Sequence, residues 1–155
     1  MNREFEIKDE KLREVVNKHS SKFENFGKHL EKSSNDIRGL EGWLEKSNVC
    51  IPCWIRLPSS HDFLGWDKID GVWRLGCQFL DENDIIHLHD HEFEEVLDNT
   101  ASHYWNTRPL IEMPVKERLE YAVYLPNLVE QLSNILPDLP DLEPGKTKNQ
   151  LLLSL

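Results

Sequence analysis

The feature that most constrains this fold is an apolar stripe in the N-terminal third of the chain. From Leu12 to Leu44 its positions recur in unbroken steps of four and three residues, and Glu, Lys and Arg fill most positions between them. This seam consists of Leu12, Val16, His19, Phe23, Phe26, Leu30, Ser33, Ile37, Leu40 and Leu44. Such spacing is typical of a helix that packs along another helix, so it predicts a coiled coil whose partner could be a second copy.

Two arrangements of residues 1–48 fit this pattern. One is a continuous helical arm, which would extend on the order of 50–60 Å at about 1.5 Å per residue. The other is a pair of amphipathic helices that folds back as a hairpin, with a break at 33–36 where Ser or Asn can cap the second helix. We expect the pair, because Ser33 is a poor seam residue and Gly39 and Gly42 each weaken a helix by roughly 1 kcal/mol.

A change of period after Asn48 predicts a small antiparallel sheet of three to four strands. The dipeptide Asp70-Gly71 separates two runs, 63–69 and 72–79, and favours a two-residue type I′ hairpin. Residues 49–57 form a further strand, which Pro52 places at an edge or a bulge because proline cannot donate to the ladder. Residues 85–91 could add a fourth strand.

The two-residue loop also predicts the register of the hairpin. Asp67 and Arg74 should then face each other on one side of the sheet and form a modest cross-strand ion pair. The opposite side should be the core side, and it carries Leu64, Trp66, Trp73, Leu75 and Cys77.

Two short helices should follow the sheet. Pro114 and Pro126 each stand where a first helical turn would begin, and helical stripes follow over 115–123 and 128–136. The segment 137–155 begins rich in proline and reads as a linker or tail. The fold class is therefore α+β, with a helical region at 1–48, an α+β domain at 49–136 and a Pro-rich tail at 137–155.

Composition limits the class of protein. The chain has 155 residues, of which 39% are hydrophobic, and no apolar run approaches the roughly 20 residues of a membrane helix. The first residues are mixed in charge and lack the apolar core of a secretion signal. We therefore expect a cytoplasmic protein without a membrane partner.

The net charge of −10 is concentrated in one segment. Residues 75–107 contain eight acidic side chains and neither Lys nor Arg. This charge disfavours direct binding to nucleic acid and favours a basic protein partner. The aromatic pair near its end could act as an interaction hot spot or belong to the core. The residues expected to bind the partner are Asp90, Glu92, Glu94, Glu95, Asp98, Tyr104 and Trp105.

Three alternating histidines lie inside the acidic segment. On a strand, His87, His89 and His91 would point to one face at about 6–7 Å spacing, and two such imidazoles can present ligands to zinc. The flanking glycines of a cupin-type metal motif are missing. No cofactor is expected for the leading hypothesis, whereas zinc or another transition metal is possible at these histidines.

Several short motifs occur together in residues 37–136: Leu40-Glu-Gly-Trp-Leu44, Gly65-Trp66, Asp70-Gly-Val-Trp-Arg-Leu75, Arg108-Pro-Leu-Ile111, Pro114 with Lys116-Glu-Arg-Leu119, and Leu125-Pro-Asn-Leu-Val-Glu130. In these motifs the chain resembles a recurring group of small uncharacterised bacterial proteins that are often met in mobile or phage-derived DNA. The resemblance spans most of residues 37–136 and implies an α+β layout in a bacterial cytoplasm, but no transferable activity.

Three functional hypotheses follow from these patterns. The leading one is a non-catalytic interaction module, such as an inhibitor, immunity-like or antitoxin-like accessory protein, that binds a basic partner through residues 81–107 and forms a homodimer through its N-terminal helices. The second is a zinc or transition-metal protein, with a metal-dependent hydrolase as one form of it, centred on His87, His89 and His91. The third is an acidic mimic of nucleic acid that occupies a DNA-binding protein.

Overall fold

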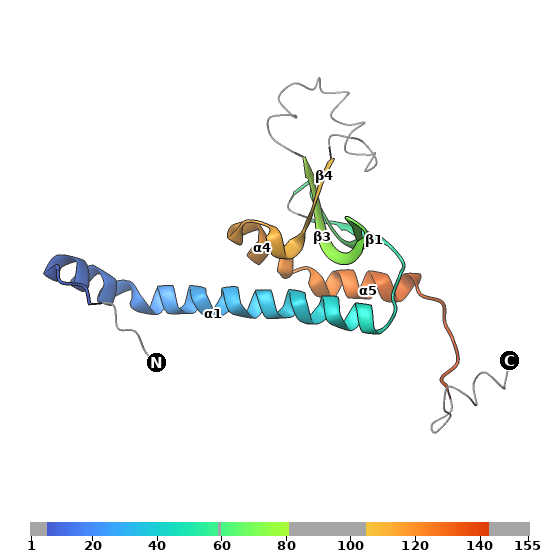
Figure 1. Ribbon diagram of the computed structural model, residues 1–155, viewed down its shortest axis with the longest axis horizontal. Helices are drawn as coiled ribbons and strands as arrows, with labels where there is room; N and C mark the ends of the chain where they lie inside the picture. The colour runs from blue at the N-terminus through green and yellow to red at the C-terminus, as the bar shows by residue number, and fades with distance from the viewer. Residues whose placement is uncertain (1–5, 59, 81–104, 143–155) are drawn as a thin grey trace, which may run out of the picture.

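The N-terminal region is one long helix. The computed structural model describes residues 6–58, 60–80 and 105–142, and in it α1 runs without interruption over Glu10–Lys46 (Figure 1). The carboxylate of Asp9 caps the helix by accepting the backbone N–H of Leu12 at 2.7 Å. Asn48, in the left-handed region with φ of 56°, follows the end of the helix.

The prediction of a helix pair broken at 33–36 is therefore wrong. Ser33 lies inside α1, where its hydroxyl donates to the carbonyl of Leu30 at 2.9 Å instead of capping a second helix. Its side chain is buried against the rest of the protein. Because serine is small and its hydroxyl is satisfied within the helix, it can occupy a buried seam position without ending the helix.

Four antiparallel strands form one sheet in the order β1-β2-β3-β4. Their bounds are Cys53–Arg56 for β1, Phe63–Ile69 for β2, Val72–Leu80 for β3 and Trp105–Pro109 for β4. The edge position expected for the first strand is confirmed, although β1 is shorter than residues 49–57. The fourth strand of the described sheet is β4, which the sequence pattern missed, and residues 85–91 lie outside the described residues.

The hairpin between β2 and β3 has the predicted register. Trp66 lies opposite Leu75 and Ile69 opposite Val72, and the two loop residues both have positive φ, 52° at Asp70 and 82° at Gly71. Leu64, Trp66, Leu75 and Cys77 are fully buried, which confirms that they are on the core side of the sheet.

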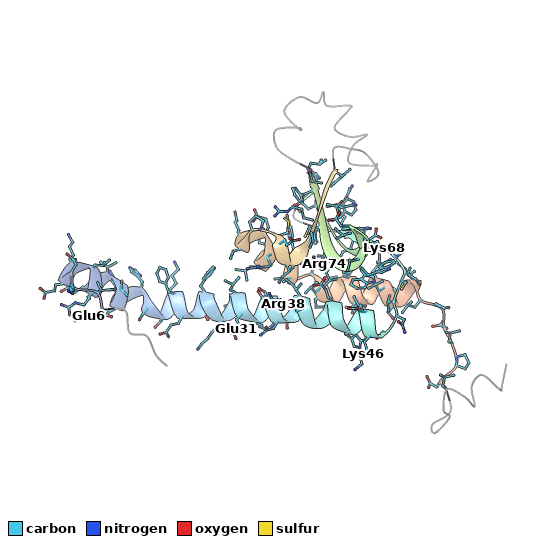
Figure 2. The ribbon with its side chains drawn as sticks, viewed as in Figure 1. Glu6, Glu31, Arg38, Lys46, Lys68 and Arg74 are labelled. Atoms are coloured by element: carbon cyan, nitrogen blue, oxygen red, sulfur yellow. The ribbon has the colours of Figure 1, made fainter. Side chains whose placement is uncertain are left out.

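The cross-strand ion pair between Asp67 and Arg74 does not form, although the two residues are register partners. Asp67 accepts the indole N–H of Trp54 at 2.9 Å, and the Arg74 guanidinium turns toward Glu41 at 3.5 Å and Glu112 at 3.8 Å. Figure 2 shows Arg74 in the space between the sheet and α1. Carboxylates brought in by other elements outcompete the local partner.

The C-terminal helices cover the core face of the sheet. A short 3-10 turn, η1 (Leu110–Glu112), leads into α4 (Val115–Ala122) and then α5 (Leu125–Ile135). Pro114 is the N-cap of α4 and Pro126 lies in the first turn of α5, which agrees with the expectation that both prolines start helices. An extended stretch, residues 136–142, leads away from the domain (Figure 1).

One core joins all these elements. Ile37 and Leu44 of α1 are buried together with strand residues and with Leu128 and Leu132 of α5. The C-terminal part of α1 is thus an integral part of the α+β domain, and α4, η1 and β3 all contact it. The expected α+β class is confirmed, with the helices on one side of a single sheet (Figure 1).

Candidate functional site

All eight acidic side chains of residues 75–107 belong to segment 81–104, which connects the neighbouring strands β3 and β4 in the chain. Leu80, the last residue of β3, is the register partner of Trp105, the first residue of β4. The two ends of segment 81–104 therefore meet at the same end of the sheet, a position at which folds commonly carry binding segments. Nine of the predicted site residues lie outside the described residues, namely His87, His89, Asp90, His91, Glu92, Glu94, Glu95, Asp98 and Tyr104.

Trp105 is the predicted site residue that the structure describes, and it is buried. Its ring packs edge-on against Phe63 with 5.3 Å between ring centroids, and the guanidinium of Arg56 lies 5.2 Å from the centre of the Phe63 ring. These side chains belong to the face of the sheet opposite the helices. Trp105 therefore anchors the end of the acidic segment to the sheet.

The N-terminal half of α1 leaves the domain as a free helix, which we call the arm and define as Glu10–His29. Every residue of the arm is exposed, and its side chains extend into open space in Figure 2. The apolar seam of α1 nevertheless continues along the arm. We call the part of the seam that lies on the arm the arm seam, and it consists of Leu12, Val16, His19, Phe23 and Phe26.

The exposure of the arm seam is unusual for side chains of this kind. Phe23 is 73% exposed and Leu12 is 51% exposed, whereas Ile37 and Leu44 on the same stripe are at 0% and 2%. Contiguous exposed apolar side chains are a criterion for a candidate interaction surface. The seam is therefore one continuous feature, of which the domain covers one end and leaves the other end open.

The arm seam contains a hollow with the geometry of a coiled-coil hole. It has a volume of about 380 Å³ and is lined by His19, Lys22, Phe23 and Phe26. These residues follow the spacing i, i+3, i+4, i+7, which is the set of four side chains that receives one side chain of a facing helix. The arm thus carries a hollow as well as exposed apolar side chains.

Glu41 holds the covered end of α1 to the sheet. Its carboxylate accepts the backbone N–H of Leu75 at 3.1 Å and lies 3.5 Å from the Arg74 guanidinium. The pairing of β3 with β4 stops at Gly76 opposite Pro109, so Glu41 supplies the acceptor beyond the end of that ladder. This contact supplements the packing of α1 against α4, η1 and β3.

A second, polar cleft lies beside α4. It has a volume of about 420 Å³, and the Tyr121 hydroxyl donates a hydrogen bond to the Asp62 carboxylate at its wall. Burial, together with the hydrogen bond to Asp62, raises the pKa of Tyr121, and burial also raises the pKa of the Cys77 thiol. Both groups therefore stay protonated at neutral pH, and we assign the Tyr121–Asp62 contact to the packing of α4 against the start of β2.

The described cysteines do not form a metal centre. Cys50 is exposed, whereas Cys53 and Cys77 are buried in the core, and all three are free thiols. No group of three or more His, Cys, Asp or Glu side chains within residues 6–58, 60–80 and 105–142 is arranged to hold a metal ion. The histidines proposed as zinc ligands lie outside these ranges.

Comparisons with known proteins add no relative. A scan against protein-family models found no match, and searches of the curated proteins and of the solved structures also found none. Within the described parts of the chain, no helix combines the length and apolar character required to cross a membrane. The candidate site is therefore defined by the geometry of this structure, in which an exposed helix seam projects from a small α+β domain.

Proposed function

We propose that this chain is a non-catalytic protein-interaction module. The arm assembles it with a second copy, and the acidic segment 81–107 receives a basic protein partner. The observation that carries the proposal is the arm seam, an apolar stripe that leaves the domain on a fully exposed helix.

Isolated helices gain little from their own sequence, so packing must stabilise the arm. The arm contains several weak helix formers, among them Asn17, Ser20 and Gly27. Burial of a Val, Leu or Phe side chain contributes roughly 1.5–3 kcal/mol. Because the four apolar arm-seam residues are 41–73% exposed, two copies that bury them would gain roughly 6–13 kcal/mol in total. This gain is of the same order as the roughly 4–15 kcal/mol that association costs.

The acidic segment supports the second half of the proposal. Eight carboxylates without a compensating Lys or Arg lie between residues 75 and 107. Their field would accelerate the encounter with a basic partner and disfavour anionic ones. The flanking residues Leu80 and Trp105 are register partners in β3 and β4, so this segment connects neighbouring strands of the sheet.

The assembly is tested by sedimentation equilibrium on the full chain. We expect a dimer for the natural sequence and a monomer for the double variant Phe23→Glu and Phe26→Glu, because two buried carboxylates in the seam would oppose pairing. The matched control is Ser21→Glu with Asn25→Glu, which adds the same charge on the other side of the exposed helix and should leave the dimer intact. A natural chain that stays monomeric at the highest attainable concentration would falsify this half.

The partner-binding half is tested by affinity capture with a charge-reversed bait. Reversal of Glu92, Glu94, Glu95 and Asp98 to Lys should abolish capture of basic proteins that the natural chain retains, and capture by the natural chain should weaken as salt is raised. Identical sets of captured proteins from both baits would contradict the proposal.

A further inference from the structure

We infer that two copies pair through their arms in antiparallel orientation, with the two-fold axis between the helices at the level of Ser21 along each arm. This inference rests on the self-association proposed above and adds its geometry. It follows from the length of the arm, from the sizes of the arm-seam side chains and from the hollow between them.

The first observation is the length of free helix. The helix begins at Glu10, and the first buried residue of the seam is Ser33. An antiparallel helix centred on Ser21 places its own Glu10 opposite Lys32, so it ends where the domain begins to cover the seam. Each copy therefore provides a free length that just accommodates the arm of the other.

A parallel pair in register does not fit in the same way. There the partner helix would continue along the seam past Ser33 toward Ile37 and Leu44, which are already buried under the chain's own sheet and helices. Figure 1 shows α4 above the middle of α1, while the N-terminal end projects beyond it. The two domains would compete for one space in the parallel pair, whereas the antiparallel pair places them at opposite ends.

The sizes of the seam residues give the second observation. In the antiparallel register Leu12 meets Leu30 of the partner, Val16 meets Phe26 and His19 meets Phe23, so neither phenylalanine faces another phenylalanine. In the parallel register Phe23 and Phe26 would each face themselves in adjacent layers, and His19 would face His19. Close packing favours facing positions that combine large and small side chains, which the antiparallel register achieves.

The hollow gives the third observation. The residue opposite Phe23 in the antiparallel register is His19 of the partner, and Phe23 is a central member of the four residues that line the hollow. An imidazole is flat and of suitable size to enter between Phe23 and Phe26 and to contact an aromatic ring. The same pairing occurs twice, once on each side of the axis.

Cysteine cross-linking tests the orientation. In a Cys50→Ser background, which removes the exposed native thiol, one copy carries Leu12→Cys and a differently tagged copy carries Leu30→Cys. We expect mild oxidation of the mixture to join the two kinds of copy, whereas each variant alone yields little disulfide. A control pair on the outer face of the helix, Glu14→Cys mixed with Lys28→Cys, is likewise symmetric about Ser21 and should not cross-link.

The outcomes separate this inference from the proposed function. Disulfides within the Leu12→Cys sample alone, with none between the two kinds of copy, would show a parallel dimer and overturn the antiparallel pairing while leaving self-association intact. A dimeric mass without cross-links in any sample would also overturn the stated register. A monomeric mass for the natural chain would overturn both.

Discussion

The carboxylate of Glu41 accepts the backbone N–H of Leu75 at 3.1 Å, and this hydrogen bond links the long helix to the sheet at the point where the pairing of β3 with β4 ends. Leu75 is fully buried, so its N–H has no access to water. Glu41 thus adds a polar contact to the apolar packing of Ile37 and Leu44 that holds α1 against the domain.

Glu41→Ala should lower the free energy of unfolding by about 1–3 kcal/mol, since it leaves the buried N–H of Leu75 unsatisfied. Glu41→Gln should lose less, because the amide oxygen can still accept that hydrogen bond. Urea denaturation measures both values. Glu45→Ala, an exposed change on the same helix, serves as the control, and an equal loss for Glu45→Ala and Glu41→Ala would refute the role of Glu41.

Gly65→Ala should destabilise the sheet by about 1–3 kcal/mol, the range for an overpacked core. A Cβ at this position would collide with the ring of Trp54 and lie 2.7 Å from the Cys53 carbonyl oxygen. Gly39→Ala is the matched control, because nothing lies within 4 Å of a Cβ there. It should stabilise the helix by up to about 1 kcal/mol, so thermal unfolding should show shifts of opposite sign.

Stability should fall at alkaline pH through Cys77 and Tyr121. Burial raises the pKa of both groups, so the folded state keeps their protons while the unfolded chain ionises thiols from about pH 8.5 and tyrosines from about pH 10. The contribution of these two protonated groups to the free energy of unfolding is complete below those pH values and is lost as pH rises above them. Urea denaturation at a series of pH values from neutral to alkaline measures this decline.

Tyr121→Phe isolates the tyrosine part of that decline. The variant should be less stable at neutral pH by about 1.5–3 kcal/mol, because it removes a hydrogen bond to the Asp62 carboxylate. It should also lose less stability than the natural chain as pH approaches 11. Tyr124→Phe, a change at a half-buried tyrosine of the same cleft, provides the comparison, and parallel pH profiles for the natural chain and Tyr121→Phe would contradict the assignment.

The three thiols should differ in reactivity toward an aromatic disulfide reagent. Cys50 is exposed and should react at once, whereas Cys53 and Cys77 are buried and burial raises the pKa of both. The thiolate is the reactive form, so both buried thiols should react only after unfolding in urea. Mass spectrometry of labelled peptides assigns each site, and rapid labelling of Cys77 in the native protein would argue against the described core.

Local chemistry made much of this fold predictable from the sequence. The turn at Asp70 and Gly71 needs two residues that tolerate positive φ, and a two-residue loop leaves one register open to the strands beside it. The seam from Leu12 to Leu44 likewise indicated a helix with one apolar face. The sequence also placed the acidic residues in one segment, but the partner-binding and metal hypotheses for that segment stay predictions.

Contacts between distant elements decided the rest. The helix continues through Ser33 because the domain buries that position, which offsets the poor seam residue. Arg74 turns from its register partner Asp67 because α1 brings Glu41 beside it. The short strand β4 carries no alternation strong enough to be recognised, since its pairing with β3 is a long-range contact.

The same division holds for the candidate site. The sequence by itself determined that one apolar stripe runs along the N-terminal helix, because the spacing of side chains on a helix is a local property. Only the tertiary structure decided that the stripe is covered from Ser33 onward, with Leu40 half-buried, and exposed before Leu30, because burial depends on where the sheet, α4 and α5 come to lie.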